Sequence, residues 1–559
     1  MRFSIVLCCL SMMWLSSCEE IQDQIDLYMP HIATHHATPQ LIVDDQPFVM
    51  LAGELHNSSA SSLQYLESVW PKLQSLNLNT VVAPVYWELG EPEEGVYDYT
   101  LVDGLIELAR DAEMRLVLLW FGSWKNGESS YAPLWVKRDT ERFFRVQTEQ
   151  GKTREILSPF CNAARDADAR AFTELLAYVE RIDAAAHTVV MMQIQNEVGL
   201  LGQRRDHSPA ADSAFAEPVP GALLEYLQTN GDVLHPEVQS AWQSQGSAMN
   251  GTWRDVFGAD AEEFFMAWHF ASYVDGIAAA GKAEYPIPLY VNAWLRAPDQ
   301  APGDYPSGGP IAKVHDIWRA AAPNIDMFAP DIYLPNFKKI SRDYKRRDNV
   351  LFIPEAHRND DSMAQAFYAI AEHDAIGYAP FGVDDIHDTT AMSAGYGFLK
   401  AMLPQIITHQ GTGKMRGVLQ EAEIQESFVL GGCRLDVDYD IYPKFNKRSY
   451  GIIIQTAPLE YLVMGSGFEV QFRPLPEDSL DVHILQVEER VYEEGEWITR
   501  RYLNGDETAA HQRVKVPVIL LKPEEVQQIQ ESTTHPPLPL PPNEYIVQRV
   551  QLYRRGVLP

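Results

Sequence analysis

Eight short apolar runs recur between residues 40 and 405, and longer helix-like segments separate them. The runs are rich in β-branched residues and show no polar alternation, which is typical of strands covered on both faces. They span residues 47–55, 80–87, 115–122, 188–197, 287–294, 325–334, 350–357 and 375–384. Eight strand-then-helix repeats predict a closed (β/α)₈ barrel rather than an open sheet.

Two other parts of the chain depart from this repeat. Residues 203–286 are too long for a plain crossover between the fourth and fifth runs, so we expect extra helices there. Residues 406–559 contain β-rich segments such as "SYGIIIQT" and "GFEVQFRPL", separated by Gly, Pro, Asp and Asn turns. They predict a C-terminal all-β, sandwich-like domain after a barrel at 40–405.

The N-terminus reads as an export signal. "MRFSIVLCCLSMMWLSSC" has one Arg and then an apolar run too short for a comfortable transmembrane helix, so residues 1–17 are predicted as a signal peptide. Its end, "LSSC", resembles a bacterial lipobox, which would leave Cys18 lipidated and residues 18–39 as a tether. The alternative is an ordinary signal peptide with an incidental Cys. We expect an exported bacterial lipoprotein, periplasmic or at the outer membrane, whose only membrane contact is the lipid anchor.

Composition limits the partners. Lys and Arg total 45 against 77 Asp and Glu, so the formal net charge is −32 and nucleic acid is not expected as a partner. The His-containing stretch at 31–36 lies in the predicted tether, and the stretch at 384–388 lacks the spaced second ligand group of a metal site. Neither a metal nor a cofactor is therefore predicted. Cys161 and Cys433 are too few and too far apart for a disulfide framework.

Polar and aromatic residues follow the predicted strands where a barrel places its active site, at the C-terminal ends. Glu197 and Glu355 end the fourth and seventh runs, on roughly opposite sides of the barrel. A lone strand-end Glu is most often only a hydrogen-bonded structural group. An opposed pair with aromatic neighbours is what glycoside hydrolysis needs, one acid and one carboxylate on either side of the sugar. The other polar and aromatic residues at these ends are Glu54, Tyr86, Trp87, Glu88, Trp124, Asn196, Asn292, Trp294, Asp331, Tyr333, His357, Asp384 and Asp385.

At the fourth run, "QIQNE" resembles the Asn-Glu signature of the clan A retaining glycoside hydrolases. The segments "LAGELHNSSA" and "NTVVAPVYWELGEPEEGVYDYT" are similar to patterns of family 35 β-galactosidases, over residues 40 to 400, and the β-rich remainder resembles a bacterial branch of that family. The resemblance implies that Glu197 is the acid/base and Glu355 the nucleophile. Gly90 and Glu88 depart from the commoner family pattern, which affects sugar specificity more than mechanism.

The remaining roles follow from this resemblance. Asn196 is expected to bind the sugar 2-hydroxyl, and Glu54, Tyr86 and Tyr333 to bind other hydroxyls or orient the nucleophile. His357, Trp87 and Trp124 complete the predicted substrate site. The expected activity is that of a retaining exo-β-galactosidase acting on oligo- or polysaccharides. The alternatives are another clan A enzyme, such as an endo-glucanase or β-mannosidase, and a non-catalytic carbohydrate-binding lipoprotein.

Overall fold

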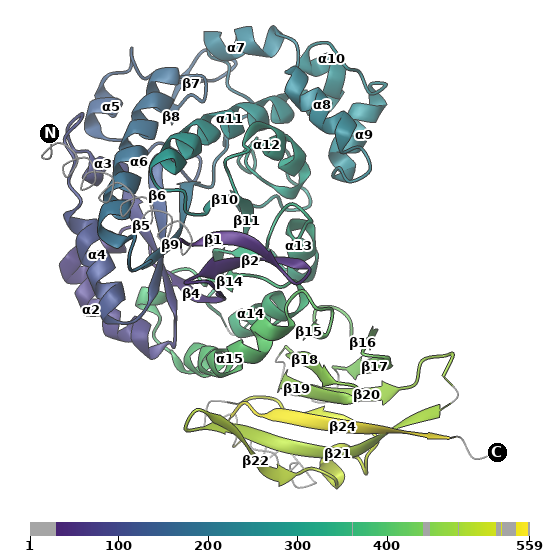
Figure 1. Cartoon of the computed structure of the whole chain (residues 1–559). Coiled ribbons are helices and arrows are strands. Elements are labelled where there is room, and N and C mark those ends of the chain that lie inside the picture. The colour runs from purple at the N-terminus through teal and green to yellow at the C-terminus, as the bar shows by residue number, and fades with distance from the viewer. Residues whose placement is uncertain are drawn as a thin grey trace, which may run out of the picture.

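The computed structural model describes residues 29–359, 361–439, 448–478, 480–520, 527 and 544–556. Figure 1 shows a large barrel ringed by helices, with a smaller β-rich unit beside the helices α14 (Ser362–Glu372) and α15 (Thr390–His409). The predicted signal peptide, Cys18 and most of the Pro-rich stretch before the last strand lie outside the described residues. No helix in the described ranges combines the length and the apolar character needed to cross a membrane.

The barrel sheet closes through its seventh strand. Its pairing order is β12-β14-β4-β5-β6-β9-β10-β11-β13, and all pairs are parallel. β12 and β13 are two halves of one run interrupted at Pro354, and they pair with β14 and β11 respectively. The two ends of the sheet therefore meet in a single strand, which confirms the predicted (β/α)₈ barrel. The strands are β4 (Met50–Glu54), β5 (Thr80–Tyr86), β6 (Arg115–Lys125), β9 (Val189–Asn196), β10 (Leu289–Trp294), β11 (Met327–Ile332), β12 (Phe352–Ile353), β13 (Glu355–Ala356) and β14 (Gly377–Tyr378).

Helices cover the outside of this sheet because each presents an apolar stripe to it. In α6 (Asn162–Asp183), for example, Ala164, Phe172, Leu175 and Val179 are buried. α2 (Leu63–Ser75) begins where the Ser62 side chain accepts a hydrogen bond from the Tyr65 N–H, a regular N-cap. The other covering helices are α4 (Thr100–Asp111), α11 (Ala261–Glu284), α12 (His315–Ala321) and α13 (Phe337–Tyr344), together with α14 and α15.

The segment predicted as a tether is partly folded. β1 (His31–His35) pairs with β2 (Thr38–Val43), which pairs in turn with β3 (Gln46–Pro47). Gln40 Nε2 donates to Gln410 Oε1 at 2.8 Å, a buried bond that ties this hairpin to the end of α15. The folded part of the chain therefore begins by residue 31, and the predicted tether does not extend to residue 39. The polar residues around 31–36 did not indicate a strand, but the backbone groups of β1 form hydrogen bonds with β2.

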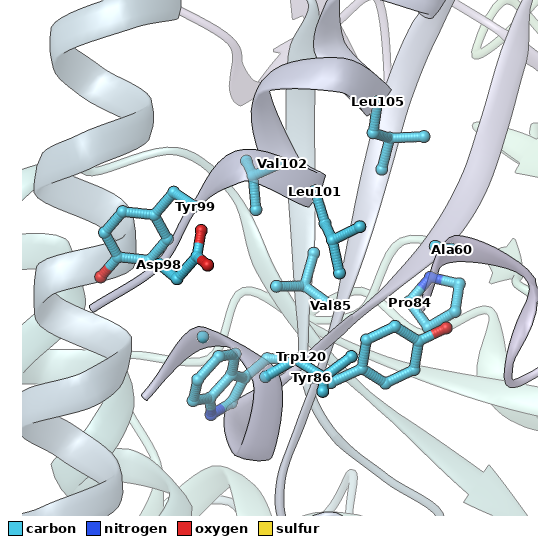
Figure 2. Close-up of a pocket in the computed structure, with 12 residues that line it drawn as sticks. Ala60, Pro84, Val85, Tyr86, Asp98, Tyr99, Leu101, Val102, Leu105 and Trp120 are labelled. Atoms are coloured by element: carbon cyan, nitrogen blue, oxygen red, sulfur yellow. The ribbon is translucent and has the colours of Figure 1, made fainter. Parts of the chain in front are cut away.

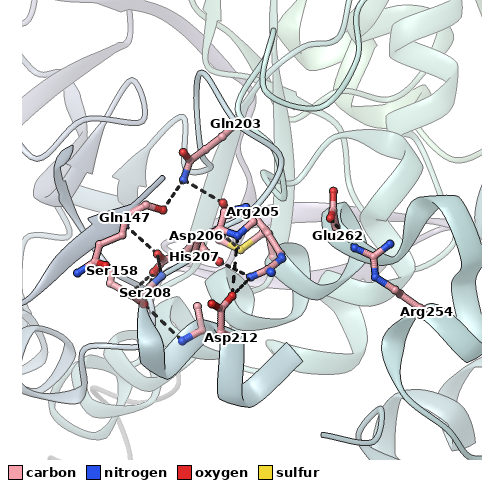
Figure 3. Close-up of polar contacts among 12 residues, drawn as sticks. Gln147, Ser158, Gln203, Arg205, Asp206, His207, Ser208, Asp212, Arg254 and Glu262 are labelled. Carbon is pink, nitrogen blue, oxygen red and sulfur yellow. Dashed lines mark hydrogen bonds and ion pairs between the residues drawn. The ribbon is translucent and has the colours of Figure 1, made fainter. Parts of the chain in front are cut away.

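The long connection after β9 carries the extra helices expected there, namely α7 (Pro209–Ala216), α8 (Gly221–Thr229), α9 (Pro236–Ser244) and α10 (Trp253–Phe257), before α11. Figure 3 shows the polar contacts that fix the first part of this connection, around residues 203–212. The buried Asp206 carboxylate accepts from Gln147 N at 3.0 Å, Ser158 Oγ at 2.6 Å and Ser208 N at 2.7 Å. One carboxylate thus joins this connection to the β7 (Arg145–Gln147) and β8 (Thr153–Leu157) hairpin.

The C-terminal part consists of two antiparallel sheets, as the sequence predicts. One has the order β15-β18-β19-β24-β21-β22 and the other β16-β17-β20-β23. A shared core joins them, with Val463 and Val550 from the first sheet and Leu435 and Val470 from the second. The strands are β15 (Met415–Leu419), β16 (Gln425–Leu430), β17 (Cys433–Asp438), β18 (Tyr450–Ala457), β19 (Glu460–Ser466), β20 (Phe468–Arg473), β21 (Leu480–Glu493), β22 (Glu496–Tyr502), β23 (Val514–Val516) and β24 (Val547–Gly556).

Candidate active site

Four carboxyl side chains converge at the mouth of the barrel, the end where the strands have their C-termini. Glu54 ends β4, Glu197 follows β9, Asp331 lies near the end of β11, and Glu355 begins β13. All four are buried, with 2% to 8% of each residue exposed. Buried carboxyls without neutralising partners are costly, so four in one place indicate a functional site.

Three of these groups are close together. One carboxylate oxygen each from Glu197, Asp331 and Glu355 lies within 4.8 Å of the other two. Within the described ranges this is the one group of three such side chains close enough to ligate a metal ion. The same spacing lets two of the carboxyls act from either side of one reacting atom.

The chain around Glu197 has an unusual backbone. Gln195 and Glu197 have φ angles of 62° and 48°, in the left-handed region that non-glycine residues rarely adopt. Such residues cost about 1–3 kcal/mol each and persist only where their surroundings fix them. The Gln195 amide is fixed at both ends, because its Oε1 accepts from the Trp124 N–H at 2.9 Å and its Nε2 donates to Asp168 Oδ2 at 2.7 Å.

Asn292, at β10, fixes the backbone of Glu197. Its Oδ1 accepts from the Glu197 N–H at 2.8 Å, and its Nδ2 donates to Asp331 Oδ2 at 2.7 Å. Both bonds are buried. The Asn292 amide therefore links the position of the Glu197 main chain to the Asp331 carboxyl.

Glu355 is held by a tyrosine from the neighbouring strand end. The Tyr333 hydroxyl donates to Glu355 Oε1 at 2.6 Å, a short bond typical of a charged acceptor. The His357 ring packs edge-on against the Tyr333 ring, with centroids 4.7 Å apart. Tyr333 is 37% exposed, so its ring also borders the open mouth. The structure thus brings together three of the predicted site residues.

The pKa values of Glu197 and Glu355 are both raised, but different neighbouring groups act on each. Burial, followed by the charge of Glu355, raises the pKa of Glu197 to about 7. Burial also raises the pKa of Glu355, but the positive charge of Lys125 and the hydrogen bond from Tyr333 both oppose that shift. Burial and the neighbouring carboxylates raise the pKa values of Glu54 and Asp331 well above the usual range. Burial thus favours the protonated form of both glutamates, and at Glu355 Lys125 and Tyr333 act in the opposite direction, toward the ionised form.

Asn196 offers hydrogen bonds that the protein does not use. Both its Oδ1 and Nδ2 are buried and have no hydrogen-bond partner among the described residues. An unpaired buried amide costs free energy, so it is best explained by a polar ligand that completes its bonds. The amide directly precedes Glu197, and its unpaired atoms could contact the same ligand.

Tyr86 and two tryptophans of the predicted substrate site, Trp87 and Trp124, are more enclosed. The Tyr86 ring stacks on Tyr131 at 5.5 Å and forms part of a small, largely apolar cavity between β5 and α4 (Figure 2). Trp87 is fully buried and donates to Glu91 Oε2 at 2.7 Å. Trp124 is also fully buried and donates to Leu157 O at 3.0 Å. These two indoles belong to the packing around the site and offer no open face to a sugar, whereas Trp294 at the end of β10 is 37% exposed.

One residue of this site, Lys125, was not among those predicted. The sequence places Asn292 and Asp331 at strand ends but assigns them no role, because nothing in it shows that they bond to each other. Lys125 ends β6, whose predicted run stopped at residue 122. Its position became clear only from the longer strand, and it is 8% exposed.

Comparisons with known proteins give family matches over two parts of the chain. A family model described as "Glycosyl hydrolases family 35" matches residues 40–267, and one described as "Domain of unknown function (DUF5597)" matches residues 392–515. No curated protein matches the chain.

Solved structures with some likeness include two β-galactosidases. The enzyme from Bacillus circulans sp. alkalophilus is 14% identical, with a TM-score of 0.45 over 64% of this chain and 57% of its own. The enzyme from the haloarchaeon Halorubrum lacusprofundi is 15% identical, with a TM-score of 0.43 over 63% and 58%. The catalytic domain of a β-amylase from Paenibacillus polymyxa is 11% identical, with a TM-score of 0.43 over 64% and 97%. The chain thus spans less than two thirds of the length of the two β-galactosidases.

Proposed function

Residues 40–267 match the model of glycosyl hydrolase family 35, and from this premise we propose that the protein is a retaining exo-β-galactosidase that removes terminal β-galactosyl residues from oligo- or polysaccharides. The observation that carries the proposal is the pair Glu197 and Glu355, which end opposed strands with carboxylate oxygens within 4.8 Å. Retaining glycosidases have carboxyl groups about 5–5.5 Å apart, whereas inverting enzymes need about 6.5–9.5 Å to admit a water. The spacing therefore supports a double displacement.

In the first step, the ionised Glu355 carboxylate attacks the anomeric carbon, and Glu197 donates its proton to the leaving glycosidic oxygen. A covalent galactosyl ester on Glu355 forms as the glycosidic bond breaks. In the second step, Glu197 takes a proton from water, and the water oxygen replaces Glu355 at the anomeric carbon. Glu197 ends protonated again, and the sugar keeps its configuration.

The surrounding residues support these roles. The raised pKa of Glu197, about 7, keeps its proton available near neutral pH. The Tyr333 hydroxyl and the Lys125 charge favour the ionised form of Glu355. The unpaired amide of Asn196 would bond the sugar 2-hydroxyl, a contact that strengthens in the transition state. Glu54, which also faces Glu355 and Glu197, would accept from another hydroxyl.

A panel of chromogenic substrates tests the activity. Nitrophenyl β-galactoside, β-glucoside, β-mannoside and α-arabinoside should be assayed with the wild type and with Glu197→Gln and Glu355→Gln. We expect the β-galactoside to be the best substrate and each variant to lose at least about 10³-fold in kcat. Wild-type hydrolysis of none of the four, or variants that keep wild-type rates, would refute the assignment.

We also propose that the enzyme is exported and anchored by lipid at Cys18. The proposal rests on the "LSSC" sequence alone. In a bacterial host fed labelled palmitate, the wild type should carry the label and fractionate with membranes, and Cys18→Ser should do neither. An unlabelled wild-type protein would contradict the lipid anchor and leave the proposed activity untouched.

A further inference from the structure

A second cleft lies away from the barrel mouth, where α15 faces the six-stranded sheet. It has a volume of about 510 Å³. Met402 and Gln405 border it from the C-terminal half of α15, the half nearer the Gln40–Gln410 contact than the mouth. The sheet supplies the rest of the lining, namely Thr456, Glu460, Leu462, Glu488, Arg490, Trp497, Thr499, Val547 and Arg549. The cleft thus lies at the junction of the two folded units.

Most charges in this cleft are paired with each other. Arg549 bonds Glu460 Oε2 at 2.5 Å and Glu488 Oε1 at 3.1 Å, so it bridges two carboxylates across three strands. The hydroxyls of Thr456 and Thr499 donate to Glu460 and Glu488, both at 2.9 Å. These bonds give the cleft a fixed polar floor, because each carboxylate is held by at least two donors.

Arg490 is the exception. Its NH2 group donates to the Trp497 carbonyl at 2.5 Å. Its Nε is buried and has no partner among the described residues, and no ion pair joins Arg490 to a described carboxylate. Arg490 therefore has donors available to a ligand in the cleft.

Trp497 supplies an aromatic wall beside this guanidinium. It is half-buried, with the Phe398 ring edge-on at 6.0 Å and the Tyr492 ring tilted at 5.3 Å. The cleft volume falls in the range of small-ligand sites, about 300–1,000 Å³. Fixed carboxylates, hydroxyls, a guanidinium without an acidic partner among the described residues and an indole together match a ligand with many hydroxyls and flat apolar faces. A sugar chain has both.

We propose that this cleft is a second carbohydrate site, which binds a stretch of the polysaccharide whose terminal β-galactosyl residues the barrel removes. The choice of polysaccharide rests on the proposed function. Arg490 and Glu488 would bond sugar hydroxyls, and Trp497 would pack against a pyranose face. Binding at two places on one molecule raises the effective concentration of chain ends near the mouth. A role in holding substrate would also explain why the enzyme carries a β-domain.

Affinity electrophoresis through gels containing soluble β-1,4-galactan tests this site. The full chain should be compared with Trp497→Ala, with Arg490→Met, which keeps the length of the side chain, and with Tyr502→Ala. Tyr502 lies on the same strand and is 62% exposed, outside the cleft, and serves as a matched control. All four proteins should carry Glu355→Gln, so that the galactan is not consumed. We expect Trp497→Ala and Arg490→Met to bind galactan about tenfold more weakly and Tyr502→Ala to match the parent.

A parent protein that galactan does not retard, or cleft variants retarded as strongly as the parent, would overturn the second site. The active proteins, with Glu355 intact, separate this result from the proposed function. The cleft variants should keep the wild-type kcat/KM on nitrophenyl β-galactoside and lose activity only on galactan, through a higher KM. Absence of nitrophenyl β-galactoside hydrolysis in the wild type would count against the proposed function alone.

Discussion

Replacing Tyr333 with Phe removes one hydroxyl and one hydrogen bond, the 2.6 Å donation to Glu355. A hydrogen bond to a charged group contributes about 1.5–3 kcal/mol, which corresponds to roughly 10- to 150-fold in kcat/KM. Because Tyr333 is 37% exposed, water can replace part of the lost bond, and we expect the lower end, about tenfold. The variant should be compared with the wild type on nitrophenyl β-galactoside between pH 4 and pH 9.

The same change predicts the direction of a pH shift. The Tyr333 hydrogen bond lowers the pKa of Glu355, so its loss raises that pKa. Less of the nucleophile is then ionised in acid, and the acid limb of kcat/KM should move to higher pH. Tyr344→Phe is the matched control, since its buried hydroxyl donates to Pro310 O at 3.0 Å and does not contact Glu355. The reasoning fails if Tyr333→Phe stays within twofold of wild type with an unmoved acid limb, or if the control shifts equally.

Three further predictions follow from the site. The basic limb of kcat/KM should fall near pH 7, because Glu197 must be protonated to act as acid and its pKa is raised to about 7; a rate that stays flat to pH 9 would exclude that role. Trp124→Phe should lower the melting temperature without raising KM, since the indole donates to Leu157 O and is fully buried; calorimetry and steady-state kinetics separate the two effects. Gly199→Ala should destabilise the mouth by at least about 2 kcal/mol, because φ is 137° and a Cβ would lie 2.7 Å from the Pro306 backbone; a denaturation midpoint equal to wild type would contradict this.

The barrel was predictable because its strands are buried on both faces. A run such as 188–197 carries no polar alternation, which is typical of a parallel strand covered on both faces. Eight such runs with helices between them are typical of a closed barrel. The structure also shows a single strand broken at Pro354, where β12 and β13 together close the ring. The short hairpin at residues 31–43 was not predicted, because its first strand has two His and one Thr and none of its residues is fully buried. The hairpin is held by backbone hydrogen bonds between β1 and β2, and the residue pattern does not predict this pairing.

The site was predictable only in part. Strand-end position identified Glu197 and Glu355, because the geometry of a barrel brings such ends together wherever they occur in the chain. The same rule misjudged Trp124, because β6 continues past residue 122 to Lys125 and the Trp124 side chain packs against Phe270 and Tyr273. The amide of Asn292, which bonds both the Glu197 backbone and Asp331, depends on register between neighbouring strands, and no spacing along the chain revealed it.

The central claim is that Glu355 becomes covalently bonded to the sugar. A 2-deoxy-2-fluoro-β-galactosyl fluoride slows the second step more than the first and lets the galactosyl-enzyme accumulate. After incubation with it, peptide mass spectrometry should find the fluorosugar on the peptide that contains Glu355, and the wild type should lose activity in step with labelling. A label on another residue, or full inactivation without any label, would contradict the assignment of Glu355 as nucleophile.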